Sequence, residues 1–269
     1  MKNKMSNMLL VIMFMIGLSL LLYPTVSDYW NSFHQSSAIT SYEESIKKID
    51  QELYDKLWKE AYAYNKTFDE NRWVLNDEEK KVYEELLDVS NQGIIGHIEI
   101  PRIKCELPIY HGVDDEILQV AIGHLEGTSL PIGGESTHAV LSGHRGLPSA
   151  KLFTDLDKVT IGDTFMIYVL DKTFTYEVDQ IHIVLPNEFD LLNIVEGEDL
   201  VTLITCTPYG VNSHRLLVRG HRIENAKEQV YITAEAFQID PILVAPILAL
   251  PILFILLILL FIPKNKNND

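Results

Sequence analysis

Residues 201–210 read VTLITCTPYG, a run of apolar and β-branched residues that ends at Cys206. The run predicts a buried strand, and Pro208 and Gly210 predict a loop after it. Residues 211–219, VNSHRLLVR, then predict a second strand with Arg215 at its beginning. A thiol at a strand end, with a permanent cation on the neighbouring strand, is one way to build a cysteine nucleophile.

The chain around this stretch consists of short strands from Gly93 onward, separated by Gly, Pro and Asp. Strands at this spacing predict a mostly β fold, a barrel or sandwich, with short helices over 116–121, 150–156 and 188–192. The predicted strands are Ile94–Ile100, Ile103–Ile109, Ala139–Ser142, Thr164–Leu170, Phe174–Leu185, Leu200–Thr205 and Leu216–Ile223.

The composition restricts the function. The net charge is −16, from 38 Asp and Glu against 22 Lys and Arg over 269 residues, which argues against binding to nucleic acid. Two cysteines suggest no disulfide framework. A single Cys105–Cys206 bridge stays open as an alternative, although it would consume the nucleophile. Cys105 lies within a predicted strand and fits a small packing residue.

The N-terminal region predicts a membrane anchor. Residues 8–23 are apolar and uncharged, and Lys2 and Lys4 precede them. No cleavage site of small residues follows, so we expect an uncleaved signal-anchor helix rather than a removed signal peptide. Residues 1–7 form a short tail before this helix.

A second membrane span is predicted over 242–262, which contains no charged residue and tolerates two prolines. Lys264 and Lys266 follow it. By the positive-inside rule, both termini, 1–7 and 263–269, lie in the cytoplasm, and the chain between the spans lies outside the cell.

Residues 24–92 predict a helical extension. A helix beginning near Ser41 has apolar residues at helical spacing, and a second begins at Asp77 with Val82, Leu86 and Leu87 on its apolar face. The extension is either a spacer that lifts the domain off the membrane, or a regulatory cover with Phe68 or Trp73 as its plug. A linker helix, 226–241, leads back to the membrane.

His144 is the candidate partner of the cysteine. It follows a predicted apolar strand, and glycines flank it in the stretch LSGHRG, 141–146. An imidazole can activate a thiol, and a guanidinium such as Arg215 can stabilise an oxyanion or orient a substrate. His111 and His124 are rival bases. A zinc site of His138 and His144 is a weaker hypothesis, because no second His or Cys cluster has metal-site spacing.

These residues resemble those of the sortases, membrane-anchored cysteine transpeptidases of Gram-positive bacteria. Sortases carry a TLxTC motif, then an Arg on the next strand, and a catalytic His after an apolar strand. Here these are residues 202–206, Arg215 and His144. The stretches GHIEIP, 96–101, and GHLEGTSLP, 123–131, extend the resemblance over about Gly93–Ile223. It implies a closed β-barrel of about eight strands over 93–225, with Cys206, His144 and Arg215 as catalytic residues.

Three features resemble the class C, pilus-assembling sortases: the stretch CTPYGVNSHR, 206–215, the long N-terminal extension, and the C-terminal span. One feature departs from that group. The Asp-Pro-aromatic lid motif does not occur between residues 40 and 90, so Phe68, Asp69 and Trp73 are left out of the catalytic set.

The resemblance implies that Cys206 cleaves an LPxTG-like sorting signal between Thr and Gly, and transfers the acyl group to an amine, a pilin lysine, without a cofactor. Two alternatives stay open. One is a housekeeping sortase that anchors surface proteins to peptidoglycan, and the other is a non-catalytic membrane scaffold. An L,D-transpeptidase is disfavoured, because its Ser-x-Gly-Cys-x-Arg context is absent from the sequence.

Overall fold

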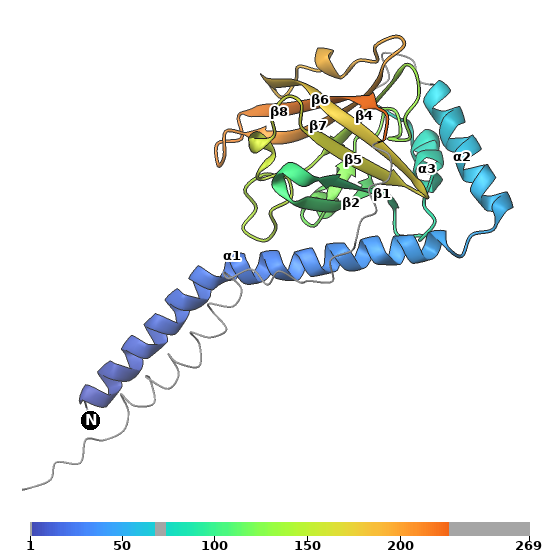
Figure 1. Ribbon diagram of the computed structural model, residues 1–269. Helices are drawn as coiled ribbons and strands as arrows, with labels where there is room; N and C mark the ends of the chain where they lie inside the picture. Colours follow the sequence, from blue (N-terminus) through green and yellow to red (C-terminus); the bar gives the residue numbers. More distant parts are fainter. Residues whose placement is uncertain (1, 68–73, 226–269) are drawn as a thin grey trace, which may run out of the picture. The chain divides into compact units, whose positions relative to one another are not determined.

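A computed structural model describes residues 2–67 and 74–225. Its centre is a closed barrel with the strand order β1-β2-β3-β4-β7-β8-β6-β5 (Figure 1). The mostly β, eight-stranded barrel expected from the sequence is therefore confirmed. The strands are β1 Ile94–Ile100, β2 Cys105–His111, β3 Ile122–His124, β4 Thr137–Ser142, β5 Thr164–Val169, β6 Lys172–Val184, β7 Asp199–Thr207 and β8 His214–Ile223.

Two neighbouring pairs in the barrel are parallel, β2 with β3 and β4 with β7, and the others are antiparallel. The β5–β6 hairpin lies between β4 and β7 in the chain. The chain returns after this hairpin and places β7 beside β4 in the same direction. The C-terminal ends of β4 and β7 therefore lie at the same edge of the barrel. That edge carries the candidate site.

The barrel interior is filled by alternating side chains. Along β5, Phe165, Ile167 and Val169 are fully buried, and the residues between them are partly exposed. This is the period of two expected for a strand with one face in the core. Gly220 of β8 leaves room for this packing, because a Cβ there would lie 2.7 Å from the ring of Phe165.

The N-terminal helices differ from the expected boundaries. α1 runs without interruption over Lys2–Ile46, so no helix begins at Ser41. The break comes at residues 47–50, where the carboxylate of Asp50 accepts the backbone N–H of Leu53 at 2.8 Å and caps α2, Gln51–Lys66.

The helix predicted from Asp77 is confirmed as α3, Asp77–Glu85, with a capping box between Asn76 and Glu79. Of its predicted apolar face, Leu86 and Leu87 are buried directly after the helix ends, whereas Val82 is exposed and Tyr83 is buried in its place.

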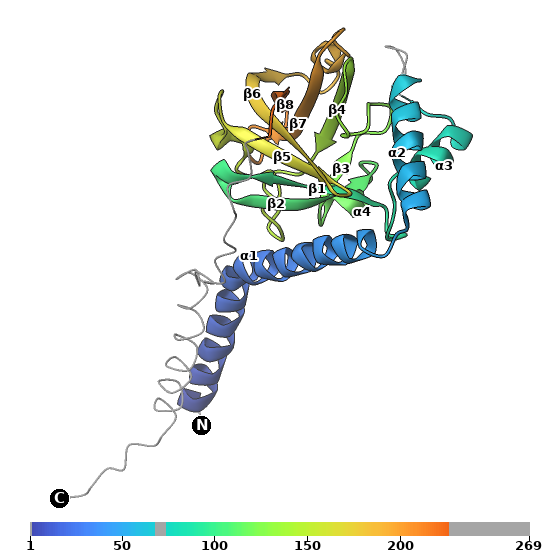
Figure 2. The same ribbon diagram turned by 45° about the vertical axis from the view of Figure 1, so that its right-hand side comes forward.

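The extension packs on the barrel rather than standing apart from it. Trp58 and Ala61 of α2, and Tyr83 of α3, belong to the same buried cluster as the barrel interior. Asn65 of α2 is buried and forms two hydrogen bonds with the backbone of Leu130, donating to its C=O at 3.1 Å and accepting its N–H at 2.7 Å. Figure 2 shows α2 and α3 beside β3 and β4.

Several short elements differ from the sequence expectation. The strand predicted from Ile103 begins at Cys105, because Lys104 takes a left-handed conformation after the 3-10 turn Pro101–Ile103. The predicted 150–156 helix is wrong: Leu152 is left-handed there, and the 3-10 turn spans only Leu156–Lys158. α4 is short, Asp115–Leu118, a 3-10 turn covers Asp190–Leu192, and β3 was not predicted.

Within the described residues, one helix is long and apolar enough to cross a membrane, Ser6–Ile46 within α1. This agrees with the predicted N-terminal anchor over 8–23. The linker helix 226–241, the second span 242–262 and the tail 263–269 lie outside the described residues.

Candidate active site

Cys206 and Arg215 lie opposite each other in the β7–β8 ladder, as partners in its antiparallel register. Directly opposed residues of an antiparallel pair project to the same face, with Cβ atoms about 4.5–5.5 Å apart. Both side chains are partly exposed, while Thr205 and Leu216 beside them are buried. The barrel thus presents the thiol and the guanidinium together on its outer face.

His144 reaches the same place from the other side of β7. β4 and β7 are parallel, with Ser142 paired to Ile204, and the same offset of 62 residues relates His144 to Cys206. Neighbouring strands lie about 4.8 Å apart. The structure therefore brings the three predicted residues to the ends of three adjacent strands, with Cys206 in the middle.

The backbone leading to His144 is tied to the backbone leading to Cys206. The N–H of Gly143 donates to the C=O of Ile204 at 3.0 Å, and the hydroxyl of Thr205 donates to the C=O of Gly143 at 2.8 Å. After the histidine, its own C=O accepts the N–H of Phe153 at 3.1 Å. These hydrogen bonds fix the position of the His144 backbone, from which the imidazole projects.

Two glycines flank His144 for steric reasons. A Cβ on Gly143 would lie 2.7 Å from the ring of Phe153. Gly146 has a φ of +76°, and a Cβ there would lie 2.9 Å from the ring of Tyr209, in the loop after the cysteine. The loops that carry His144 and follow Cys206 can therefore pack closely only with glycine at these positions.

Arg145 is a site residue that the sequence analysis missed. Its side chain is only 9% exposed and forms an ion pair with Asp157, and it also donates to the hydroxyl of Thr207 at 3.3 Å. The hydrogen bond from Arg145 to Thr207 thus joins the residue after His144 to the residue after Cys206. The available signal was its position beside the histidine, but nothing in the sequence pointed to Asp157.

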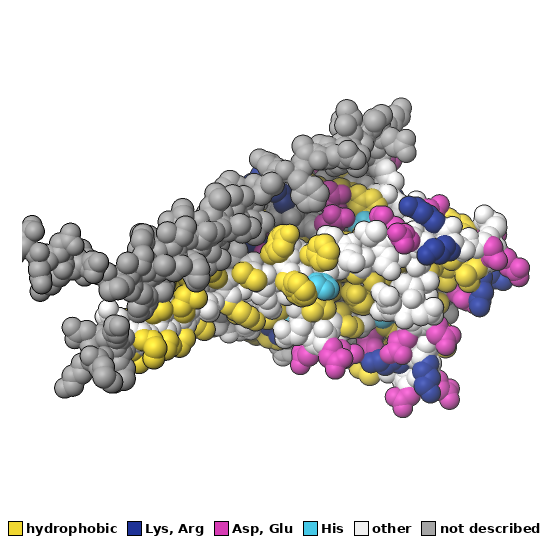
Figure 3. All heavy atoms as spheres, turned by 90° about the horizontal axis from the view of Figure 1, so that it is seen from below, with side chains coloured by type: hydrophobic (Ala, Val, Ile, Leu, Met, Phe, Trp, Pro, Cys, Tyr) yellow, Lys and Arg dark blue, Asp and Glu magenta, His cyan; other side chains and the backbone are white. Residues whose placement is uncertain are grey.

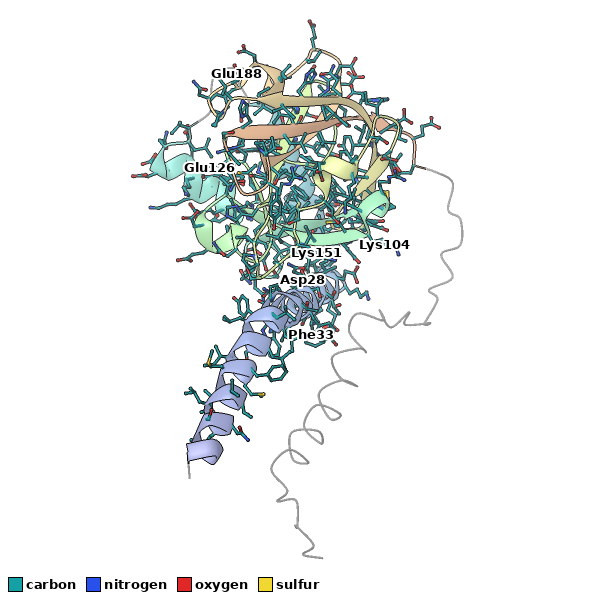
Figure 4. All side chains as sticks on the ribbon, turned by 90° about the vertical axis from the view of Figure 1, so that its left-hand side faces the viewer. Asp28, Phe33, Lys104, Glu126, Lys151 and Glu188 are labelled. Carbon is teal, nitrogen blue, oxygen red and sulfur yellow. The ribbon has the colours of Figure 1, made fainter. Side chains whose placement is uncertain are left out.

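A pocket of about 150 Å³ lies next to Arg215. Its lining includes Ile204, which shares a face with Cys206 because the two are separated by one residue in β7. Glu188, in the connection between β6 and β7, lies in Figure 4 at the end of the barrel away from α1. The lining is Val113, Leu125, Ser142, Val184, Leu185, Pro186, Glu188, Phe189, Leu192, Ile204, Arg215 and Leu217.

The connection between β6 and β7 is anchored by His138 of β4. Its Nδ1–H donates to the C=O of Asn193 at 2.8 Å, so Nε2 is the acceptor of the Thr202 hydroxyl, also at 2.8 Å. Burial lowers the pKa of His138, which favours the neutral ring that these two bonds need. With both nitrogens engaged, His138 has no free lone pair for the zinc site considered above.

The other candidate nucleophile and bases are placed elsewhere. Both cysteines are free thiols, and Cys105, on β2, packs its sulfur 3.8 Å from the C=O of Leu152. Burial raises the pKa of the Cys105 thiol to about 12, so it stays protonated.

His111 and His124 pair across β2 and β3, and burial lowers their pKa values to about 4 and about 3. Neither strand is next to β7. Phe68, Asp69 and Trp73, the residues considered for a lid, lie outside the described residues.

Comparisons with known proteins agree with this geometry. The family model of the sortase domain matches residues 98–223. Sortase D of Bacillus subtilis (strain 168) is 30% identical over 131 residues, 48% of this chain and 63% of that protein. The match therefore spans less than two thirds of that relative.

Solved structures are more similar. Sortase C1 of Streptococcus agalactiae is 49% identical, with a TM-score of 0.69, covering 71% of this chain and all (100%) of that one. Sortase C1 of GBS pilus island 1 is also 49% identical, with a TM-score of 0.67, covering 73% of this chain and 95% of that one.

Proposed function

Because this chain belongs to the sortase family, whose members are cysteine transpeptidases, we propose that it is a pilus-assembling enzyme. Its substrate is an LPxTG-like sorting signal, which it cleaves between Thr and Gly. The acceptor is the amine of a pilin lysine. The observation that supports this proposal most is the placement of Cys206 between Arg215 and the end of the strand that leads to His144.

In the first step, the Cys206 thiolate, whose proton is held by His144, attacks the carbonyl carbon of the substrate threonine. A sulfur–carbon bond forms, and Arg215 donates to the developing oxyanion. The carbon–nitrogen bond to glycine then breaks, and the leaving amine takes a proton from His144. The products are a thioester on Cys206 and the released C-terminal fragment.

In the second step, the lysine amine attacks the thioester carbon, and its excess proton passes to the neutral His144. The carbon–sulfur bond breaks and an isopeptide bond replaces it. The apolar pocket beside Arg215 has the chemistry to hold the aliphatic part of the sorting signal. No step needs a metal or an organic cofactor.

The location follows from the same proposal. α1 anchors the chain in the cell membrane, the segment 242–262 crosses the membrane a second time, and both termini lie in the cytoplasm. The barrel then lies outside the cell, where membrane-held pilins would expose their sorting signals.

The experiment is a transfer reaction with the full chain in detergent. The acceptor is offered as a pilin, or as a triglycine amine that imitates a peptidoglycan cross-bridge. The proposal predicts pilin oligomers joined through lysine, lost in Cys206→Ala. Transfer to triglycine alone would support a housekeeping sortase. Absence of both products, with no cleavage of an LPxTG peptide, would support the non-catalytic scaffold.

A further inference from the structure

The face of α1 that points away from the barrel carries exposed aromatic residues just beyond the apolar run. Tyr29 is 56% exposed, Trp30 64% and Phe33 65%, and Val26 lies one turn earlier with 62% exposed. Their spacing of three and four residues places them on one side of the helix. Large apolar groups grouped this way on a surface mark an interaction site.

The opposite face of the same turns is fixed to the barrel. Asp28 accepts the backbone N–H of Lys151 at 2.8 Å, and Asn31 donates to the C=O of Ser149 at 2.8 Å. One turn later, Gln35 donates to the C=O of Val120 at 2.7 Å. In Figure 4, Asp28 lies between α1 and the barrel near Lys151, and Phe33 lies on the outer side. The barrel therefore cannot cover the aromatic face.

The outer face also lacks the charges that a water-exposed helix carries. Between residues 24 and 42, the only Asp, Glu, Lys or Arg is Asp28, which is bonded to the barrel. Charged residues resume at Glu43 and Glu44. Figure 3 shows apolar side chains along this face, and most of the charged side chains gathered at the other end of the view.

The length of the helix sets the depth of these residues. At about 1.5 Å per residue, Val26 lies about 27 Å along the helix from Met8, and Tyr29–Phe33 lie about 32–38 Å along it. The hydrocarbon core of a bilayer is about 30 Å thick. An anchor that enters at Met8 therefore reaches the opposite headgroup layer close to Val26, and turns that then follow the membrane surface keep the three aromatic residues in that layer, where Tyr and Trp are favoured.

We propose that Val26, Tyr29, Trp30 and Phe33 form a membrane-contact face that rests on the lipid headgroup layer, while the opposite face of α1 holds the barrel. This inference rests on the proposed function only in taking α1 as the membrane anchor. Pro24 lies inside α1, and Figures 1 and 2 both show α1 bent. A proline bend allows the turns after it to run along the membrane surface rather than straight away from it. The contact would hold the barrel at a fixed distance from the bilayer.

The test is tryptophan quenching by brominated lipids. The full chain is reconstituted into vesicles of phosphatidylcholine and phosphatidylglycerol, with bromine either close to the headgroup or deep in the acyl chain. We expect the shallow bromine to quench emission more than the deep one, and we expect Trp30→Phe to remove most of that quenching. Trp30 is one of three tryptophans, so the difference between the two proteins isolates its signal.

A matched control moves the indole away from the membrane. The variant Trp30→Phe/Val82→Trp carries it on the exposed face of α3, and its shallow quenching should stay at the level of Trp30→Phe. Equal shallow quenching in the wild type and Trp30→Phe would overturn the proposal, as would stronger quenching by the deep bromine. So would a blue-shifted but unquenched Trp30 emission, which would mean that a protein segment covers this face.

Cleavage of an LPxTG peptide is measured in the same vesicles. A protein that cleaves the peptide but fails the quenching test would disprove the membrane-contact face and leave the proposed function standing. A protein that passes the quenching test but does not cleave the peptide would disprove the proposed function and leave the membrane-contact face standing.

Discussion

Cys206 and Arg215 occupy partner positions in the antiparallel ladder of β7 and β8, two residues from where each strand meets the connecting loop. The pairing makes their proximity a property of the barrel rather than of a flexible loop. The guanidinium donates only to backbone carbonyls, those of Asn212 at 3.2 Å and His214 at 3.1 Å, among the hydrogen bonds of the described residues. It has no carboxylate partner there that would compete with an oxyanion.

Replacement of Arg215 should therefore lower the rate of the chemical step. We expect Arg215→Gln to reduce kcat by about 10²–10³-fold, the usual cost of one oxyanion donor. Arg215→Lys should fall between this variant and the wild type, because it keeps the charge and loses the planar fork. Arg222→Gln, near the other end of β8, is the matched control and should leave kcat within about twofold of the wild type. Similar losses at both arginines would mean that β8 is merely destabilised.

The contact between Arg145 and Asp157 should position His144. Asp157→Asn removes the negative charge that pairs with Arg145, so the loop that carries His144 is held less firmly. We expect kcat to fall about tenfold, because small misplacements of reacting groups slow the chemical step strongly. The rate of thioester formation on Cys206 should fall by a similar factor, since the imidazole is less well placed to give its proton to the leaving amine. Asp179→Asn breaks the comparable ion pair with Arg219, away from His144, and serves as the control. Equal rates of thioester formation in wild type and Asp157→Asn would contradict the positioning role.

Asn65 should account for much of the attachment of α2 to the barrel. Asn65→Ala leaves the N–H and C=O of Leu130 without their partner, and each unsatisfied group costs about 1–3 kcal/mol. We expect the free energy of unfolding to fall by about 2–4 kcal/mol in urea denaturation. The exposed Asn187→Ala should change it by less than about 0.5 kcal/mol. An unchanged stability in Asn65→Ala would contradict this, and would mean that the apolar contacts of α2 hold it to the barrel without the two hydrogen bonds.

Acid should destabilise the fold through its buried histidines. Burial lowers the pKa values of His97 and His111 to about 4, and that of His124 to about 3, from the ordinary histidine value of 6.5. Below pH 6.5 the unfolded chain binds protons that the folded chain does not, so stability is full above pH 6.5 and falls toward pH 4. At about 1.36 kcal/mol per pH unit, each of these histidines lowers the free energy of unfolding by about 2 kcal/mol between pH 6.5 and pH 5.

Urea midpoints between pH 7.5 and 5 measure this loss. In the wild type, the ring centroids of His97 and Tyr168 lie 4.4 Å apart, and His97→Phe keeps a ring at this position. The variant removes one proton-binding group from the unfolded chain, so its free energy of unfolding should fall less steeply between pH 6.5 and pH 5 than that of the wild type. His182→Phe, at an exposed position, should not change it. A slope that is the same in wild type and His97→Phe would contradict the assignment.

Strand patterns alone predicted a barrel or sandwich, and the resemblance to sortases narrowed this to a closed barrel of about eight strands. The placement of Cys206, His144 and Arg215 at strand ends could be predicted because the apolar runs and turn residues beside them are local features. The contact of Arg145 with Asp157 could not be predicted, because it depends on how the loop after β4 folds back. β3 has only three residues, too few to show a period. The continuity of α1 through Pro24 and Ser41 was missed, because apolar and polar stretches of one helix were interpreted as separate elements.

The most direct test of the catalytic assignment is mass spectrometry of the full chain after incubation with an LPxTG-type peptide. We predict a thioester adduct on Cys206 that survives in Cys105→Ala and is absent from Cys206→Ala. An adduct on Cys105, or cleavage of the peptide by Cys206→Ala, would contradict the account.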